Sequence, residues 1–354
     1  MINVAINGFG RIGRALLRLS LNCSDIKISH IYDIKNFEIL AYLLANDSLL
    51  KNFKGKIEYK KDKFFVNGNE IKITNDFSGA DIVVECSGAN LNTKSLQSYL
   101  RNGAKRVILS APPKDNMPIF IYGVNWQKYR GEAIFSSASC TSNAIAPIIY
   151  AIAKKYKILG GNISTIHPFN SDQNLLDNPH AFDKRLSRNA TQNIIPTSST
   201  IGAVLERVLC EGGESKGESS ESSGVGESKR KSGGVGEFRR ESSDFNHESS
   251  GIFGRFYGDS IRVPTSLVCF SNVDLLLDVT PTLNDILDLK FDKKIIAFDD
   301  EMRVSSDFVG DSHSAIIPKD LIKINGNILR IGLWFDNESG YVSRMLNIIS
   351  ELGL

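Results

Sequence analysis

The chain has 354 residues, enough for two domains, and 42% of them are hydrophobic and 23% charged, as in ordinary globular proteins. A formal net charge of only +2 gives no electrostatic reason to expect nucleic acid or an anionic membrane as the main partner. Arginines interrupt the apolar residues at the N-terminus, and no run approaches the roughly 18 apolar residues of a membrane span, so we expect a cytoplasmic protein.

The first part of the chain alternates short strands with helices. The expected elements are a strand at 2–6, a glycine-rich turn at 7–13, a helix at 14–22, a strand at 26–32 and two further apolar strands at 82–84 and 107–109. Strands that alternate with helices predict a parallel α/β sheet. We therefore expect residues 1–139 to form a Rossmann dinucleotide-binding domain.

The second part has longer strands and fewer helices. A helix is expected from 144 to 157, strands at 163–166, 261–263, 268–279 and 328–335, and a terminal helix at 341–354. This pattern favours an α+β domain on a mostly antiparallel sheet. We expect this second domain to span residues 140–339.

One segment, residues 211–258, belongs to neither pattern. It consists mainly of Gly, Ser, Glu, Lys and Arg, and it contains the near-repeats 223–227 and 233–237. Such a composition buries too little apolar surface to offset the entropy of ordering. We expect a disordered surface insertion, either a tolerated low-complexity segment or a functional one.

The turn after the first strand has the spacing of a dinucleotide fingerprint, Gly8-Phe9-Gly10-Arg11-Ile12-Gly13. It follows a strand, opens a helix and has Asp33 about 20 residues further on, at the end of the next strand. The helix start offers free N–H groups to phosphates, and an acid in this position favours NAD over NADP. The alternative is a structural turn in which Asp33 only caps a strand end.

Five cysteines without paired spacing indicate reduced thiols, and Cys140 directly precedes a helical run. The helix start predicts a lowered pKa for its thiol and offers N–H groups for an oxyanion hole. His167 ends a strand 27 residues later and is a candidate base. Spacing alone also allows both to be structural residues. The remaining histidines show no metal-ligand spacing, so no metal is expected.

Several ordered motifs resemble those of one family, glyceraldehyde-3-phosphate dehydrogenase. The motifs are Asn7–Arg14, Ser139–Asn143, Ile261–Thr265, Ser305–Phe308 and Trp334–Glu338. They cover nearly the whole chain except the insertion. The resemblance implies a bacterial NAD-dependent type, a terminal helix at 340–354 that returns to the first domain, and a homotetramer.

The resemblance also implies the reaction. Cys140 attacks the aldehyde of D-glyceraldehyde 3-phosphate, His167 takes the hydroxyl proton as hydride passes to NAD, and inorganic phosphate cleaves the thioester to give 1,3-bisphosphoglycerate. Asn337 is implied to fix the nicotinamide amide, and Ser110 to lie near the nicotinamide ribose. The implied substrate and phosphate ligands are Ser139, Thr141, Asn170, Ser199, Thr200 and Arg262.

Some residues depart from the family pattern. Asn170 stands where Thr is usual, Ser199-Thr200 where Thr-Gly is usual, and Ser339 where an aromatic residue is usual. These departures keep two alternatives open. One is erythrose-4-phosphate dehydrogenase, in which water completes the acyl transfer, and the other is a degenerate, non-catalytic paralogue.

Overall fold

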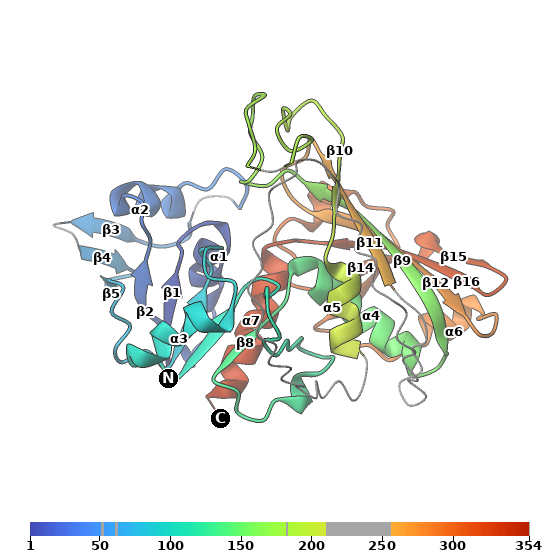
Figure 1. Ribbon diagram of the computed structural model, residues 1–354, viewed down its shortest axis with the longest axis horizontal. Coiled ribbons are helices and arrows are strands. Elements are labelled where there is room, and N and C mark those ends of the chain that lie inside the picture. The colour runs from blue at the N-terminus through green and yellow to red at the C-terminus, as the bar shows by residue number, and fades with distance from the viewer. Residues whose placement is uncertain (51–52, 61–62, 182, 210–255, 354) are drawn as a thin grey trace, which may run out of the picture.

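The computed structural model describes residues 1–50, 53–60, 63–181, 183–209 and 256–353 (Figure 1). Most of the expected insertion therefore lies outside the described residues. Its predicted end at residue 258 is wrong, because 256–258 form the beginning of a strand, β11. The aromatic residues Phe256 and Tyr257 supply the β propensity that the Gly/Ser-rich segment lacks.

The first sheet has the strand order β3-β4-β5-β2-β1-β6-β7-β8, with parallel pairing from β5 to β8. In chain order, its strands and the helices between them are β1 (Ile2–Asn7), α1 (Arg11–Ser20), β2 (Ile26–Tyr32), α2 (Phe37–Ala45), β3 (Ile57–Lys60), β4 (Lys63–Val66), β5 (Asn69–Ile73), β6 (Ile82–Glu85), α3 (Thr93–Arg101), β7 (Arg106–Leu109), η1 (Trp126–Lys128) and β8 (Ile134–Ser136). The antiparallel strands β3 and β4 extend the sheet at one edge. The parallel α/β sheet expected from the sequence is confirmed.

The second sheet has the order β10-β11-β9-β12-β16-β14-β13, with β15 also paired to β16. Its elements are α4 (Cys140–Ala153), β9 (Ile158–Pro168), β10 (Ile195–Ser198), α5 (Ile201–Leu209), β11 (Phe256–Val263), β12 (Cys269–Leu277), α6 (Leu283–Leu287), β13 (Ile296–Asp299), η2 (Ser305–Phe308), β14 (Ala315–Pro318), η3 (Lys319–Leu321), β15 (Ile322–Asn325) and β16 (Ile328–Phe335). The pairs β9–β11 and β13–β14 are parallel and the others antiparallel. The sheet is thus mixed, with antiparallel pairs in the majority.

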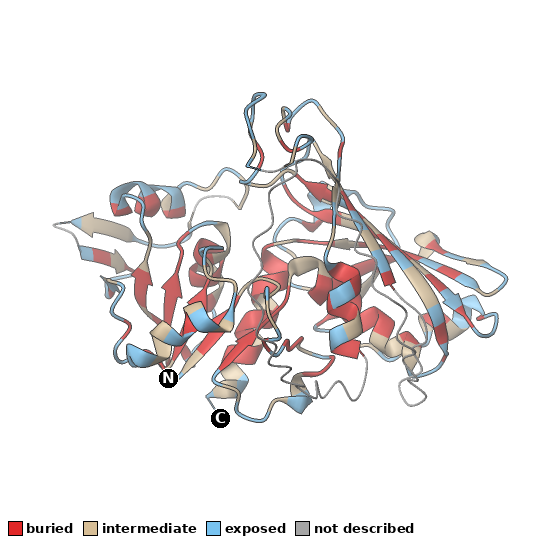
Figure 2. Cartoon of the chain, viewed as in Figure 1, coloured by how far each residue is buried: buried red, intermediate tan, exposed pale blue. Residues whose placement is uncertain are grey.

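The last helix, α7 (Ser339–Leu352), packs against α1 and joins the hydrophobic core of the first sheet. Figure 2 shows that α7 and α4 are largely buried, whereas the outer face of α2 is exposed. The start of α4 lies where the two cores meet, because Cys140 packs against both of them. The fold therefore places this cysteine between the two sheets.

Candidate functional site

The glycine-rich turn connects β1 to α1 and has little room for side chains at two positions. Gly8 has φ +95°, and a Cβ added there would lie 2.4 Å from the backbone nitrogen of Ser87. A Cβ on Gly13 would lie 2.2 Å from the carbonyl oxygen of Gly8, whereas one on Gly10 would meet nothing within 4 Å. The first and third glycines therefore permit the packing, and the second leaves open space above the turn.

The first turn of α1 is suited to an anion. Its first intrahelical bond runs from Arg14 N to Gly10 O at 3.0 Å, so the N–H groups of residues 11–13 have no helical acceptor. No acidic residue stands in this turn, and Gly10 provides no side-chain cap. The helix dipole and these N–H groups thus favour a phosphate above Gly10.

Asp33 follows β2 directly and lies beside this turn. Its Oδ2 accepts from Phe9 N at 2.7 Å, and its Oδ1 accepts from Lys35 N at 2.9 Å. These bonds hold the carboxylate at the carboxyl end of the sheet, where Rossmann folds bind the ribose. Ser110 lies at the same edge, after β7, and its hydroxyl donates to the Glu85 carbonyl at 2.8 Å.

Cys140 is the first residue of α4. Ser139 caps the helix, and its Oγ accepts from Ser142 N at 3.1 Å. The Cys140 thiol lies 3.9 Å from the Thr141 hydroxyl. Ser139 and Thr141 are the chain neighbours of Cys140, and the Thr141 hydroxyl lies beside its thiol.

The predicted lowering of the Cys140 pKa is wrong for this structure. Burial raises the pKa of the thiol, and this effect outweighs the hydrogen bonds from Thr141 and the positive charge of Arg262. The sequence located the helix start but gave no measure of how far the sulfur is removed from water. The thiol form is therefore favoured at neutral pH.

The backbone just before Cys140 is strained. Ala138 has φ +59°, a left-handed conformation that costs an alanine roughly 1–2 kcal/mol. Two contacts hold it: Ala138 N donates to Ser136 Oγ at 2.9 Å, and the Tyr341 hydroxyl donates to the Ala138 carbonyl at 3.2 Å. The Tyr341 hydroxyl also lies 2.7 Å from Ser137 Oγ. Helix α7 thus fixes the loop that presents the cysteine.

His167 lies near the end of β9 and is buried. Its Nδ1 lies 2.7 Å from the Pro168 carbonyl, which can only accept, so Nδ1 carries the proton and Nε2 of the neutral ring is the basic atom. Burial and then the charge of Arg262 lower the pKa of His167 to about 4. Among the described contacts, the imidazole makes no hydrogen bond with the Cys140 thiol.

Arg262 on β11 is paired in register with His167 on β9. When the Asn170 amide is oriented with its oxygen toward Arg262, that oxygen accepts from NH2 at 3.2 Å and from NH1 at 3.0 Å. The buried Nε of Arg262 has no partner among the described atoms. The structure therefore brings Arg262 and Asn170 together, and the guanidinium keeps a donor for an anion.

Ser199 and Thr200 lie at the start of α5. The Thr200 carbonyl accepts from Val204 N at 3.1 Å, and Ser199 Oγ accepts from Ile201 N at 3.3 Å. The preceding residue, Ser198, pairs with Asp259, three residues before Arg262 on β11, or roughly 10 Å along the strand. The structure does not place these two residues in contact with the Arg262–Asn170 pair.

Asn337 follows β16, and its side-chain Oδ1 is buried without a partner among the described atoms. A buried acceptor without a donor is costly, and a ligand N–H would satisfy it. The neighbouring Asp336 carboxylate fixes the backbone by accepting from the N–H groups of Glu338 and Ser339, each at 2.8 Å. Three features together fit a nicotinamide dinucleotide: the Asn337 Oδ1 that needs a donor, the open space at Gly10 and the placement of Asp33.

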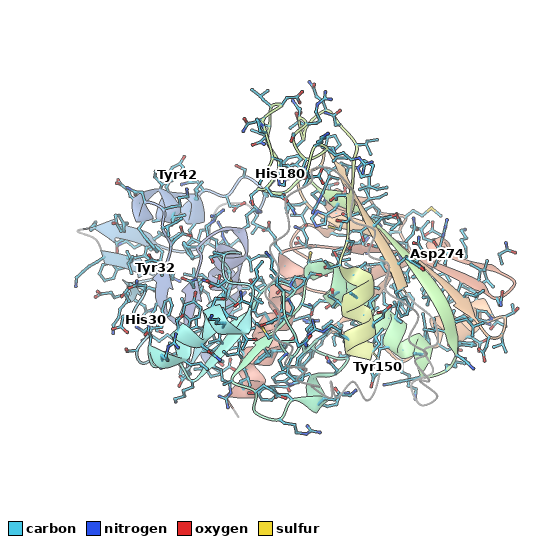
Figure 3. All side chains as sticks on the ribbon, in the orientation of Figure 1. His30, Tyr32, Tyr42, Tyr150, His180 and Asp274 are labelled. Carbon is cyan, nitrogen blue, oxygen red and sulfur yellow. The ribbon has the colours of Figure 1, made fainter. Side chains whose placement is uncertain are left out.

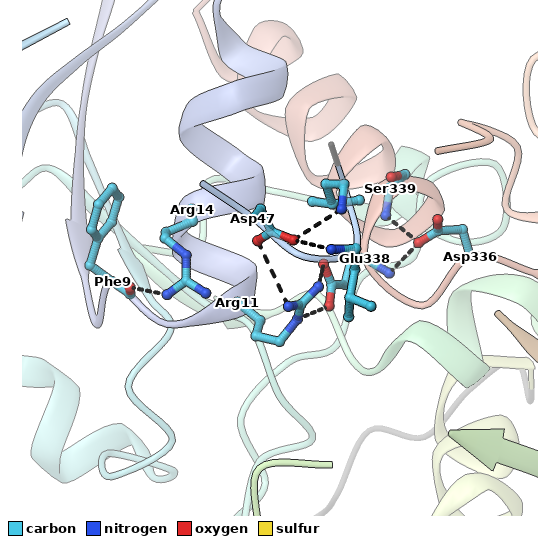
Figure 4. A network of polar contacts seen from close by, with 9 residues as sticks. Phe9, Arg11, Arg14, Asp47, Asp336, Glu338 and Ser339 are labelled. Carbon is cyan, nitrogen blue, oxygen red and sulfur yellow. Dashed lines mark hydrogen bonds and ion pairs between the residues drawn. The ribbon is translucent and has the colours of Figure 1, made fainter. Parts of the chain in front are cut away.

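One network at this site was missed by sequence reasoning. The Arg11 guanidinium donates to both carboxylate oxygens of Glu338, with NH2 to Oε2 at 2.8 Å, and its NH1 lies 3.8 Å from Asp47 Oδ2 (Figure 4). Arg11 was predicted as a cofactor-binding residue. Its side chain engages these carboxylates, which leaves only its backbone N–H for that predicted role. The residues are 327 positions apart, so no local signal indicates the pair.

Glu85 is a second residue that the sequence reasoning missed. This carboxylate, at the end of β6, is 1% exposed and accepts from Asn7 Nδ2 at 2.6 Å, the Tyr99 hydroxyl at 2.6 Å and Ser87 N at 2.6 Å. It fixes Ser87, on which Gly8 packs. The sequence did contain a signal for Glu85, since it is an acid directly after the apolar run 82–84. Ligands bind at the carboxyl ends of such strands, so an acid there indicates a site residue.

Within the described ranges, no group of three or more His, Cys, Asp and Glu side chains is arranged to hold a metal ion. His30 lies on the first sheet and His180 on the loop between β9 and β10, well apart in Figure 3. The part of the chain that the structure describes also has no helix long and apolar enough to cross a membrane.

Comparison with known families gives two matches. Residues 2–93 match the model for the NAD-binding domain of glyceraldehyde 3-phosphate dehydrogenase, and residues 139–220 and 240–337 match the model for its C-terminal domain. The segment that interrupts the second match lies inside the expected insertion.

The chain is similar along its length to enzymes named glyceraldehyde-3-phosphate dehydrogenase. It is 35% identical to that of Helicobacter pylori, over 98% of each chain. It is 31% identical to that of Salmonella typhimurium, over 99% of each chain. It is 32% identical to the cytosolic enzyme of Leishmania mexicana, over 99% of this chain and 98% of the relative.

Proposed function

This chain belongs to the glyceraldehyde-3-phosphate dehydrogenase family, and from that premise we propose that it is the phosphorylating enzyme, which converts D-glyceraldehyde 3-phosphate to 1,3-bisphosphoglycerate. Because the chain belongs to this family, it is an NAD-dependent oxidoreductase that acts on an aldehyde group. The observation that carries the finer proposal is the placement of Arg262. It lies near enough to Cys140 for its charge to act on the thiol, it pairs in register with His167, and it donates to Asn170.

In the proposed reaction, Cys140 is the nucleophile and His167 is the base. The thiol proton passes to Nε2 of the neutral His167, and the thiolate attacks the aldehyde carbon. The protonated imidazole returns this proton to the carbonyl oxygen, which gives a hemithioacetal on Cys140. The raised pKa of the thiol and the lowered pKa of His167 both favour a neutral thiol and a neutral imidazole before substrate binds.

When bound, NAD supplies the hydride acceptor for the oxidation. His167 takes the hydroxyl proton of the hemithioacetal as hydride leaves its carbon, which gives a thioester on Cys140. Inorganic phosphate then attacks the thioester carbon, the C–S bond breaks, and the acyl phosphate leaves. In this proposal, backbone N–H groups at the start of α4 stabilise the oxyanion at each addition.

Cofactor binding is proposed for the residues around the first turn of α1. The backbone at Gly8, Gly10, Arg11, Ile12 and Gly13 would hold the pyrophosphate. The remaining contacts are assigned to Asp33 on a ribose, Ser110 near the nicotinamide ribose, and Asn337 on the nicotinamide amide. The open space at Gly10 and the unpartnered Asn337 Oδ1 support this assignment.

The substrate and phosphate ligands are proposed from the surroundings of the thiol. Arg262 and Asn170 are assigned to one phosphate group, because they lie together and Arg262 Nε has no partner among the described atoms. Ser139 and Thr141, which flank Cys140, are assigned to the second phosphate. Ser199 and Thr200 are retained for this second phosphate on the resemblance alone.

We also propose the domain division 1–139 and 140–339, with 340–354 returning to the first domain, and a homotetramer. Packing of α7 with α1 supports the return of the last segment. A cytoplasmic location is proposed because the Leishmania relative is named as cytosolic.

The experiment that tests this function follows NADH formation with glyceraldehyde 3-phosphate or erythrose 4-phosphate, each with and without inorganic phosphate. The proposal predicts turnover of the triose that depends on phosphate. Turnover of the tetrose without phosphate would instead support erythrose-4-phosphate dehydrogenase. No turnover of either sugar would leave a non-catalytic paralogue.

A further inference from the structure

The pair formed by Arg11 and Glu338 joins two parts of the proposed cofactor site. Arg11 is the first residue of α1, whose N–H groups face the phosphate position, and Glu338 directly follows Asn337. The two hydrogen bonds of the guanidinium to the two carboxylate oxygens form a fork, which fixes orientation as well as distance.

The surroundings make this pair hard to separate. The side chains of Glu338 and Asp47 are only 4% and 5% exposed. Arg11 lies within ion-pair distance of both, and Arg14 acts on both from further away. Burial raises the pKa of Glu338 and the charge of Arg11 opposes that rise. Loss of Arg11 would leave the buried Glu338 carboxylate without its hydrogen-bonded cation, which is unfavourable even with Arg14 acting at longer range.

Asn337 lies between two anchored residues. On one side, the Asp336 carboxylate accepts from the N–H groups of Glu338 and Ser339 and, at 2.8 Å, from Gly310 N. On the other side, the Glu338 side chain is held by Arg11. The Asn337 Oδ1 itself has no partner among the described atoms, so its direction depends on these two anchors.

We propose that Arg11 is a positioning residue which, through its fork on Glu338, aligns Asn337 for the nicotinamide amide. The inference rests on the proposed role of Asn337 in NAD binding. The proposed role of the Arg11 side chain is thus distinct from phosphate binding. Helix α1, which would bind the pyrophosphate, would also orient Asn337, which would bind the nicotinamide amide.

The test compares the affinities of NAD and ADP-ribose in the full-length protein by calorimetry. ADP-ribose carries the pyrophosphate and both riboses but no nicotinamide. In Arg11→Gln we expect Kd for NAD to rise about 10-fold, as for one lost charge-assisted hydrogen bond, and Kd for ADP-ribose to change less than about twofold. An equal loss for both ligands would overturn the inference and leave the proposed function standing.

Two further variants keep the test decisive. Arg11→Lys retains the charge but loses the fork, so it should show the same selective loss, to a smaller degree, even if Arg11→Gln fails to fold. The matched control is Arg330→Gln, which removes an exposed fork on Asp274, with distances of 2.6 and 3.0 Å, and should change neither affinity.

A double mutant shows whether Arg11 acts through Asn337. If it does, Arg11→Gln combined with Asn337→Ala should lose no more NAD affinity than Asn337→Ala alone, whereas additive losses would overturn the inference. If the unaltered protein binds NAD no tighter than ADP-ribose, the proposed role of Asn337 fails, and the inference fails with it.

Discussion

His167 and Arg262 lie opposite each other on the parallel strands β9 and β11, and both contact the carbonyl oxygen of Pro168. The imidazole Nδ1 is 2.7 Å and the guanidinium NH1 is 3.5 Å from this oxygen. The arrangement places a fixed positive charge beside the proposed base and keeps that base neutral. It also leaves Nε2 as the atom that takes protons.

The first prediction concerns the pH dependence of stability. The folded pKa of His167 is about 4, below the ordinary 6.5, so between these values the unfolded chain binds a proton that the folded protein does not. The contribution of His167 is complete above pH 6.5 and is lost as pH falls toward 4, by at most about 3 kcal/mol. Denaturant titrations from pH 7 to 4 should therefore show a shallower decline for His167→Gln, and parallel declines would contradict this assignment.

The second prediction concerns the reactivity of Cys140. Because burial raises the pKa of the thiol, iodoacetamide should label Cys140 slowly at pH 7 in the cofactor-free protein, and faster as pH rises above 9. Arg262→Gln removes a charge that favours the thiolate, so labelling should slow further. Peptide mass spectrometry measures each site, with Cys23 as the internal control. Rapid labelling at pH 7 would show a thiolate that this geometry does not predict.

The third prediction concerns the phosphate ligands. Arg262→Lys keeps the charge but loses the fork on Asn170, so KM for glyceraldehyde 3-phosphate should rise about 10- to 100-fold. Asn170→Ala, which removes the acceptor that orients Arg262, should give a smaller rise. Steady-state kinetics measures both, with Arg330→Gln as the control. A fall in kcat without a change in KM would place Arg262 outside substrate binding.

The fourth prediction concerns Tyr341. Tyr341→Phe removes the bonds to Ser137 and Ala138 and should lower the free energy of unfolding by about 1–3 kcal/mol. It should also lower kcat, because Ala138 is then free to leave its left-handed conformation and displace Cys140. Ala138→Gly accepts the same φ without strain and should partly restore the stability of the variant. Unchanged stability and kcat in Tyr341→Phe would show that α7 does not hold this loop.

Local patterns predicted the parts of the fold that depend on local structure. The glycine turn and the strand 26–32 were found because apolar periodicity and turn residues specify them. The helix expected at 144–157 was also found, but its bounds were wrong, because the structure has it at Cys140–Ala153. The antiparallel strands β3 and β4 and the helix α2 were not predicted. The Arg11–Glu338 pair and the strained Ala138 depend on contacts hundreds of residues away, and the Cys140 pKa depends on burial. No window of sequence contains that information.

The most direct test of the central claim is a rapid-mixing experiment without phosphate. On mixing the enzyme with NAD and glyceraldehyde 3-phosphate, we predict a burst of about one NADH per chain, an acyl group on Cys140 detected by mass spectrometry, and steady turnover only after inorganic phosphate is added. Cys140→Ala should show neither burst nor acyl group. Steady NADH formation without phosphate, or a burst that survives in Cys140→Ala, would contradict a phosphorylating mechanism through this cysteine.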